Sequence, residues 1–300
     1  MSELAWTEIR VLVPLGWQEL VAETLANGPC TSVAFGRPTL ASEPAPEGFD
    51  YVRTFVASAS DTPALRAEVR ASLDALAERA QIAELGALAL EFHELPPEDY
   101  ARSWMKVWKP FRVGRLAVVA PWRESVLRER DLRLELEPGG AFGSGRHATT
   151  RMCLRVLQER LRPGSRLVDA GSGSGILTVA AALLGAREAV GFDIDPNAQA
   201  WAEDLARRNG VVAHARFLTA GFECLPALGR FDAFLANIYS DLIVEQAGLL
   251  REALVPGGWF AFSGCSEQHA PAAREAIERS GLHLEEVRVR GRWHTFAGIR

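Results

Sequence analysis

Three glycines spaced two residues apart, Gly171, Gly173 and Gly175, follow a segment predicted as a strand, residues 166–170. A helix is predicted to begin at the third glycine. A turn of this kind lets the backbone approach a bulky ligand closely, because glycine has no Cβ to block the approach. The start of the helix adds unpaired N–H groups and the positive end of the helix dipole. The segment therefore predicts a ligand-binding turn at the end of a strand.

Two acidic residues narrow the choice of ligand. A dinucleotide turn has the pattern Gly-x-Gly-x-x-Gly, but Ile176 stands here at the position of its third glycine. Asp169 lies two residues before the first glycine, where a carboxylate can interact with an amino group but has no use facing a pyrophosphate. Asp193 ends the next predicted strand and can accept hydrogen bonds from both ribose hydroxyls, although a nicotinamide enzyme would use it in the same way. Asp-x-Gly-x-Gly-x-Gly resembles the first motif of class I methyltransferases, which implies S-adenosylmethionine as the cofactor.

A second candidate site follows the strand predicted over residues 231–236. Asn237-Ile238-Tyr239 is similar to the start of the Asn-Pro-Pro-Tyr motif of amine methyltransferases, but it lacks the prolines. The resemblance implies that the asparagine carbonyl and a following backbone carbonyl accept hydrogen bonds from the target nitrogen and aim its lone pair at the sulfonium methyl. The missing prolines weaken the analogy with enzymes that methylate DNA adenine. Alternatively, Asn237 only caps the helix predicted from residue 240.

Two further helix starts can be predicted from capping residues. Asp195 precedes Pro196, which is typical of an N-cap followed by proline at the first helical position. Four glycines in residues 138–150 indicate a loop that is flexible or closely approached by other groups. Thr149 or Thr150 can cap the helix that follows this loop.

The loop at 138–150 carries the most specific resemblance in the chain. It is similar to the signature Pro-Gly-x-Ala-Phe-Gly-Thr-Gly-x-His-x-Thr-Thr of the ribosomal protein L-eleven (L11) methyltransferase family, with Ser144 in place of a threonine. Cys265, in a segment where the family has Ser-Gly-Ile, is a second departure, and Ser172 stands where cysteine is frequent. The resemblance covers about residues 97–300, whereas the front segment matches in size, order of elements and acidity. Other matching segments are 173–177, 193–196, 236–238 and 256–258.

This resemblance implies a two-domain enzyme, with a substrate-recognition domain over 1–95 that grips the ribosomal protein, a linker helix within 96–113, and a methyltransferase domain over 114–300. It also implies that the enzyme methylates lysine side chains and the terminal amine of L11 to the trimethyl state. The implied cofactor contacts are Phe142, Thr149, Thr150, Asp169, Gly171, Gly173, Gly175, Asp193 and Asn237. The implied catalytic residue is Asn237, and the candidates for an additional catalytic role are His147 and Tyr239.

The elements that position these residues follow from periodicity. In the front segment the order is strand, helix, strand, strand, helix, strand, which is typical of a ferredoxin-like α+β sandwich. Alternating strands and helices in the rest predict a Rossmann-like α/β domain with a seven-stranded, mostly parallel sheet. The front elements are strands 6–13, 31–36, 50–57 and 87–93 and helices 17–26 and 61–83. The linker helix is 97–109, with later helices at 148–161, 175–184, 196–209, 240–253 and 269–280. The later strands are 115–121, 166–170, 189–193, 214–218, 231–236, 258–263, 283–290 and 292–299.

Charge and composition support these predictions and leave rivals open. Of the 300 residues, 48% are hydrophobic and 24% charged, and the net charge of −5 gives the whole molecule no attraction to nucleic acid. Residues 1–95 hold 14 acidic and 6 basic residues, which suits a basic partner but also fits a solvated surface. Two rival functions stay open. Residues 100–133 hold nine basic and three acidic residues, with Trp104 and Trp108 interleaved. An RNA methyltransferase would use such a segment to bind RNA. A non-catalytic cofactor-binding module is the other rival, whereas the glycine spacing excludes a nicotinamide oxidoreductase.

The remaining features predict a cytoplasmic protein without metal. Cysteines at 30, 153, 224 and 265 form no Cys-x-x-Cys pair, so we interpret them as reduced core thiols. The six histidines show no metal-ligand spacing. The N-terminus has no signal peptide, and the most apolar stretch, 177–184, is too short to span a bilayer. Nothing in the sequence requires more than a monomer.

Overall fold

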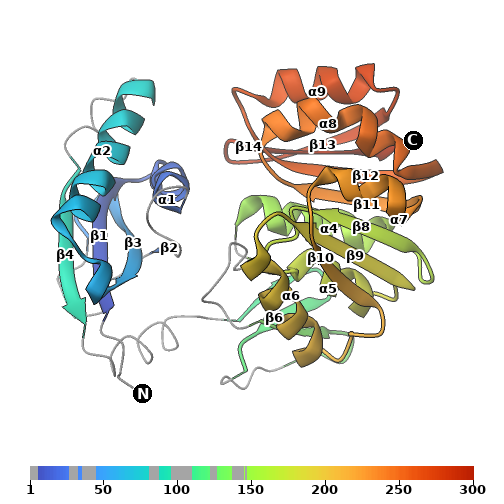
Figure 1. The fold of residues 1–300 in the computed structure, drawn as a ribbon, viewed down its shortest axis with the longest axis horizontal. Coiled ribbons are helices and arrows are strands. Elements are labelled where there is room, and N and C mark those ends of the chain that lie inside the picture. Colours follow the sequence, from blue (N-terminus) through green and yellow to red (C-terminus); the bar gives the residue numbers. More distant parts are fainter. Residues whose placement is uncertain are drawn as a thin grey trace. The chain divides into compact units, whose positions relative to one another are not determined.

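The computed structural model describes residues 6–26, 33–35, 45–80, 88–95, 110–121, 127–136, 145 and 147–300. The chain divides into two compact units, Met1–Trp108 and Lys109–Arg300, each with its own sheet (Figure 1). The division falls within the segment predicted as a linker, 96–113. The linker helix itself, predicted over 97–109, lies outside the described residues and stays a prediction.

The front unit is an α+β sandwich, as predicted. All its strand pairs are antiparallel, and the strand order is β2-β3-β1-β4. Alternate residues of the first strand, Ile9, Val11 and Val13, are fully buried against helix residues such as Val69 and Leu73. The elements are β1 (Trp6–Pro14), α1 (Gln18–Ala26), β2 (Val33–Phe35), β3 (Phe49–Ala57), α2 (Pro63–Ala80) and β4 (Leu90–Leu95).

The second unit is built on the predicted seven-stranded sheet. Its strand order is β10-β9-β8-β11-β12-β14-β13, and β14 runs in the opposite direction to the other six strands. The strands, in chain order, are β5 (Phe111–Val113), β6 (Leu116–Val119), β7 (Leu132–Glu135), β8 (Arg166–Ala170), β9 (Glu188–Asp193), β10 (Ala215–Thr219), β11 (Phe231–Asn237), β12 (Leu254–Ser266), β13 (His283–Arg290) and β14 (Trp293–Ile299). The helices are α4 (Ala148–Arg160), α5 (Ile176–Leu183), α6 (Pro196–Arg208), α7 (Leu225–Leu228), α8 (Ser240–Glu252) and α9 (Ala270–Arg279).

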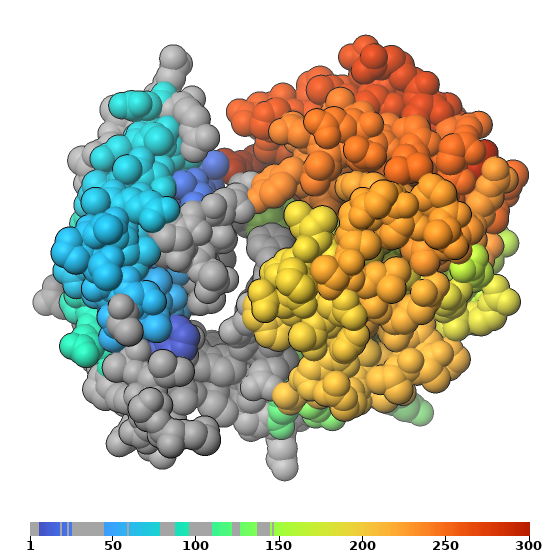
Figure 2. Space-filling view, in the orientation of Figure 1, coloured from blue at the N-terminus to red at the C-terminus, as the bar shows by residue number. Residues whose placement is uncertain are grey.

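The helices of this unit form two groups. Helix α5 packs against both α4 and α6, whereas α8 packs against α9. In the space-filling view, α6, α8 and α9, yellow through orange, make up much of the visible surface of the unit (Figure 2). Strand β12 contacts α4, from the first group, and α8, from the second. Helices of both groups thus pack on the central strands, which are buried and have nearly continuous apolar sequences.

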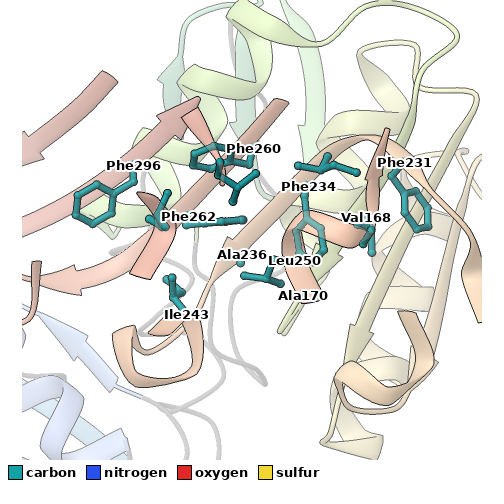
Figure 3. Packing of buried hydrophobic residues seen from close by; sticks show 14 of the residues in the cluster. Val168, Ala170, Phe231, Phe234, Ala236, Ile243, Leu250, Phe260, Phe262 and Phe296 are labelled. Carbon is teal, nitrogen blue, oxygen red and sulfur yellow. The ribbon is translucent and has the colours of Figure 1, made fainter. Parts of the chain in front are cut away.

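Phenylalanines from three neighbouring strands form the centre of the core (Figure 3). Phe231 and Phe234 lie on β11, Phe260 and Phe262 on β12, and Phe296 on β14, and each side chain is at most 1% exposed. The rings of Phe234 and Phe262 meet edge to face, with centroids 5.9 Å apart. Such close-packed rings hold the ends of β11 and β12 in fixed positions.

Strands β8 and β11 define the place where a ligand is expected. They are parallel neighbours in the middle of the sheet, with Ala170 opposite Ala236. The sheet extends on the β8 side through β9 and β10 and on the β11 side through β12. In open α/β sheets, ligands bind outside the carboxyl ends of the strands at this reversal of strand order. The glycine turn follows β8, and Asn237 is the last residue of β11.

Some predicted elements differ from those observed. The prediction missed β5, β7 and α7, and it placed β12 over 258–263 instead of Leu254–Ser266. Strands β5, β6 and β7 form a separate three-stranded sheet, of which only β6 was expected, within 115–121. The missed β7, Leu-Arg-Leu-Glu, alternates apolar and charged residues over only four positions, which is too short for the pattern to stand out.

The thiols and metal ligands in the described ranges give no new site. Cys153 and Cys265 are buried and Cys224 is partly buried, and all three are free thiols, whereas Cys30 lies outside the described residues. Burial raises the pKa of both the Cys153 and Cys265 thiols to about 12, which makes them unreactive. No group of potential metal ligands occurs in the part of the chain that the structure describes. None of the helices described here has the length and apolarity that crossing a membrane requires.

Candidate active site

The glycine turn lies between β8 and α5, as predicted. The φ angles of Gly171, Gly173 and Gly175 are 64°, 49° and 78°, and residues other than glycine rarely adopt such values. Neighbouring protein atoms also require glycine at two of these positions. A Cβ on Gly171 would lie 2.4 Å from Ile238 Cγ2, and one on Gly175 would lie 2.7 Å from Ala202 Cβ. The turn therefore packs directly against the segment that follows β11.

Asp193 holds the turn in place from the end of β9. Its Oδ2 accepts a hydrogen bond from Gly173 N–H at 2.9 Å, and its Oδ1 accepts one from Asp195 N–H at 3.0 Å. A carboxylate has about four lone-pair sites, so both oxygens can still accept from ribose hydroxyls. The neighbouring Asp195 caps α6 as predicted, because its Oδ1 accepts from Asn197 N–H at 2.9 Å and Pro196 follows.

Asn237 is tied to helix α4 through its side chain. Its Nδ2 donates a hydrogen bond to Thr150 Oγ1 at 3.3 Å, and Thr150 is only 2% exposed. Since the nitrogen points to Thr150, the carbonyl oxygen of the same amide points away from it and can accept from a ligand. The N-cap of α8 is Tyr239. The alternative that Asn237 caps this helix is therefore wrong.

His147 is the N-cap of α4, so the prediction that Thr149 or Thr150 caps this helix is wrong. The backbone N–H of Thr149 donates to His147 Nδ1 at 3.4 Å, and the Thr149 hydroxyl lies 2.7 Å from the same nitrogen. The imidazole also meets the ring of Trp293 edge-on, with centroids 5.1 Å apart. These contacts brace the start of α4, which carries Thr150. A catalytic role for His147 stays a prediction.

The remaining predicted site residues are Phe142, Thr149, Tyr239 and Asp169. Phe142 lies outside the described residues. Thr149 is buried at the start of α4, whereas Tyr239 is 50% exposed directly after the strand end. Asp169 lies in β8, directly before the glycine turn, and is 1% exposed. Its Oδ2 accepts a hydrogen bond from the hydroxyl of Thr178 at 2.8 Å.

Comparison with known proteins identifies the family. The profile of the ribosomal protein L11 methyltransferase family matches residues 5–300. The chain belongs to this family. It is 35% identical to the ribosomal protein L11 methyltransferase of Geobacter sulfurreducens, over 96% of both chains. It is 43% identical to that of Pelotomaculum thermopropionicum, over 70% of this chain and 68% of the relative. A crystal structure of ribosomal protein L11 methylase from Lactobacillus delbrueckii subsp. bulgaricus aligns with a TM-score of 0.58 and 26% identity, over 63% of this chain and 96% of that chain.

Members of this family use S-adenosylmethionine, and the residues at the strand ends fit that cofactor. Asp169 Oδ1 is buried and has no hydrogen-bond partner among the described residues. Burial raises the pKa of Asp169 to about 7, the hydrogen bond from Thr178 opposes the rise, and the charge of Asp193 adds to it. A buried carboxylate without a full set of partners favours a cationic ligand, such as the ammonium of a methionine moiety. The lone pairs that Asp193 has left are in keeping with its predicted role as the acceptor for the ribose hydroxyls.

Asp169 predicts a pH-dependent affinity for the cofactor. Below its pKa of about 7 the carboxyl is protonated, and the proton must leave before the oxygen can pair with an ammonium group. The affinity should therefore rise with pH, by about tenfold between about pH 5.5 and 7. Asp169→Asn should bind more weakly and without this dependence, because an amide does not titrate in this range. Calorimetric titration of both proteins checks this, and parallel pH profiles would rule out Asp169 as the titrating group.

The sequence interpretation missed two residues at this site. Thr178 is the only polar side chain of α5 and is fully buried, which requires a partner nearby, so its role could have been suspected. Ile194 follows Asp193 directly and is 80% exposed. A large apolar side chain beside the predicted ribose acceptor offers a surface for the base of an adenosyl group. Its position between two acids was the only local signal.

Proposed function

We propose that this protein transfers methyl groups from S-adenosylmethionine to amino groups of ribosomal protein L11. The acceptors are lysine side chains and the N-terminal amine, and the product is the trimethylated amine. The observation that carries this proposal is Asn237, which ends β11 next to the glycine turn and whose amide is oriented by Thr150. When bound, the cofactor supplies an electrophilic methyl group on a sulfonium.

The residues of the chain act on the amine. A free lysine has a pKa of about 10.4, so its neutralisation at pH 7 costs about 4–5 kcal/mol. An apolar environment around the amine lowers this cost, since burial disfavours the charged form. The proton leaves to water. The dimethylated amine of the third transfer keeps no N–H, but in the first two transfers the carbonyl of Asn237 accepts a hydrogen bond from an N–H of the neutral amine. This contact aims the nitrogen lone pair, which accelerates transfer by alignment rather than by proton abstraction.

The front unit is proposed to bind the substrate. Residues 1–95 carry 14 acidic and 6 basic residues, and this excess of negative charge suits a basic ribosomal protein. In this proposal 96–113 link the two domains, 114–300 bind the cofactor, and the protein acts as a monomer in the cytoplasm. RNA methylation through residues 100–133 and cofactor binding without catalysis are the rival outcomes.

Chemical blocking of the acceptor tests the proposal. Purified L11 and L11 with all its amines acetylated are each incubated with the protein and S-adenosylmethionine, and methylated residues are identified by mass spectrometry. We expect methyl groups on lysines and on the terminal amine of native L11, and no transfer to acetylated L11. Transfer that persists after acetylation would show that the acceptor is not an amine.

A further inference from the structure

Gly264 lies at an irregularity of β12. In the register between β12 and β14, Ser263 is opposite Thr295 and Cys265 is opposite His294, so Gly264 has no residue opposite it in β14. Its φ angle is +93°. This is a bulge, and bulges next to active sites redirect a strand or end its pairing. Here the bulge lies at the carboxyl end of the strand next to β11.

The bulge brings Gly264 against the backbone of Ile238, the residue after Asn237. A Cβ on Gly264 would lie 2.1 Å from the carbonyl oxygen of Ile238, 2.9 Å from its carbonyl carbon and 3.2 Å from its nitrogen. All three are backbone atoms, so no side-chain movement could make room for the Cβ. On the same side, Ile238 N–H donates a hydrogen bond to the carbonyl of Ser263 at 3.1 Å. The backbone of Ile238 is therefore fixed by β12.

The side chain of Ile238 packs in the other direction, against the cofactor turn. Its Cγ2 occupies the space where a Cβ of Gly171 would be, at 2.4 Å from that position. Gly171 follows β8 and Gly264 lies in β12, and these strands are the two neighbours of β11. Ile238 is thus held between two glycines that come from either side of its own strand.

We propose that Ile238 is a positioning residue, clamped between Gly171 and Gly264, that fixes the carbonyl acceptors after β11 relative to the cofactor turn. The inference rests on the proposed function, because it assumes that Asn237 acts on the amine. Proline would restrict the backbone at this position through its ring. In this chain, which has isoleucine there, the contacts with the two glycines take over that restriction.

Two glycines of β12 provide a matched test. Gly257 also has a positive φ, +76°, but a Cβ there would have no atom within 4 Å. Gly264→Ala and Gly257→Ala therefore share the backbone strain, and only the first disrupts the clamp. We expect Gly264→Ala to raise the hydrogen-exchange rate of the Ile238 amide by about tenfold or more and to lower kcat by about 100-fold, with a smaller change in the Kd for S-adenosylmethionine. Gly257→Ala should change neither the exchange rate nor kcat.

Substitutions of Ile238 test the clamp even if Gly264→Ala does not fold. Ile238→Val keeps the Cγ2 methyl over Gly171, whereas Ile238→Leu keeps the volume but moves the branch away from Cβ. We expect Ile238→Leu to lower kcat by about tenfold and the conservative Ile238→Val to retain activity. The proposal would be overturned if Gly264→Ala and Gly257→Ala had equal exchange rates and equal turnover, and if Ile238→Leu and Ile238→Val did as well. A failure to methylate L11 would contradict the proposed function. The contacts of Ile238 with the two glycines could still be tested, because hydrogen exchange of the Ile238 amide needs no substrate.

Discussion

Replacement of Asn237 by alanine is expected to lower the rate of methyl transfer to L11 by about 100-fold or more. The substitution removes the carbonyl that we propose aligns the amine, whereas it leaves in place the glycine turn and Asp193, the predicted cofactor contacts. The Kd for S-adenosylmethionine should therefore change by less than the turnover. Single-turnover rates and calorimetric Kd values, measured on the same preparations, separate the two effects.

Thr150 provides the control for this prediction. Thr150→Val removes the hydroxyl that accepts from Asn237 Nδ2 but keeps the shape of the side chain. If Thr150 acts through Asn237, the double variant should be no slower than Asn237→Ala alone. Undiminished turnover in Asn237→Ala would refute the assignment of this residue.

Replacement of Asp193 by alanine should weaken the binding of S-adenosylmethionine by about 100-fold or more, because at least two hydrogen bonds to a charged group are lost. The variant loses the acceptor for the ribose and also leaves the N–H of Gly173 without its partner, so the turn loosens. Asp195→Ala is the matched control two residues away. It removes only the cap of α6, which should cost about 1 kcal/mol of folding stability.

Thermal denaturation and cofactor titration of both variants distinguish these roles. We expect Asp195→Ala to lower the melting temperature with little change in cofactor affinity, and Asp193→Ala to lose affinity. Similar losses of affinity in the two variants would mean that the carboxylate of Asp193 has no special role. In that case the ribose would have to be bound elsewhere.

Much of the fold could be predicted from local sequence, because the elements of the second unit are long and carry clear signals. The strand at 166–170, the three glycines and the apolar helix after them predict β8, the turn and α5. Asp195 and Pro196 predict the start of α6, as observed. The short strands of the β5-β6-β7 sheet carry only three or four residues each, and their pairing depends on contacts that no local pattern contains.

The individual residues of the site could be predicted better than their contacts. The ends of β8, β9 and β11 follow from the strand pattern, so Asp193 and Asn237 could be placed at one edge of the sheet. The contacts of Asn237 with Thr150 and of Ile238 with Gly264 could not be predicted. They depend on how α4 and β12 pack against β11. The cap of α4 was predicted wrongly for a similar reason. His147 is held in its capping position partly by Trp293, a residue far away in the chain.

The most direct test of the account is a methyl-transfer survey of ribosomal components. Purified protein and labelled S-adenosylmethionine are incubated with ribosomal proteins, free and assembled with ribosomal RNA, and the labelled product is identified by mass. We expect one labelled band, at ribosomal protein L11, and about 100-fold less label in that band with Asn237→Ala after the same short reaction time. Label in RNA, or cofactor binding without label in any ribosomal component, would contradict the account.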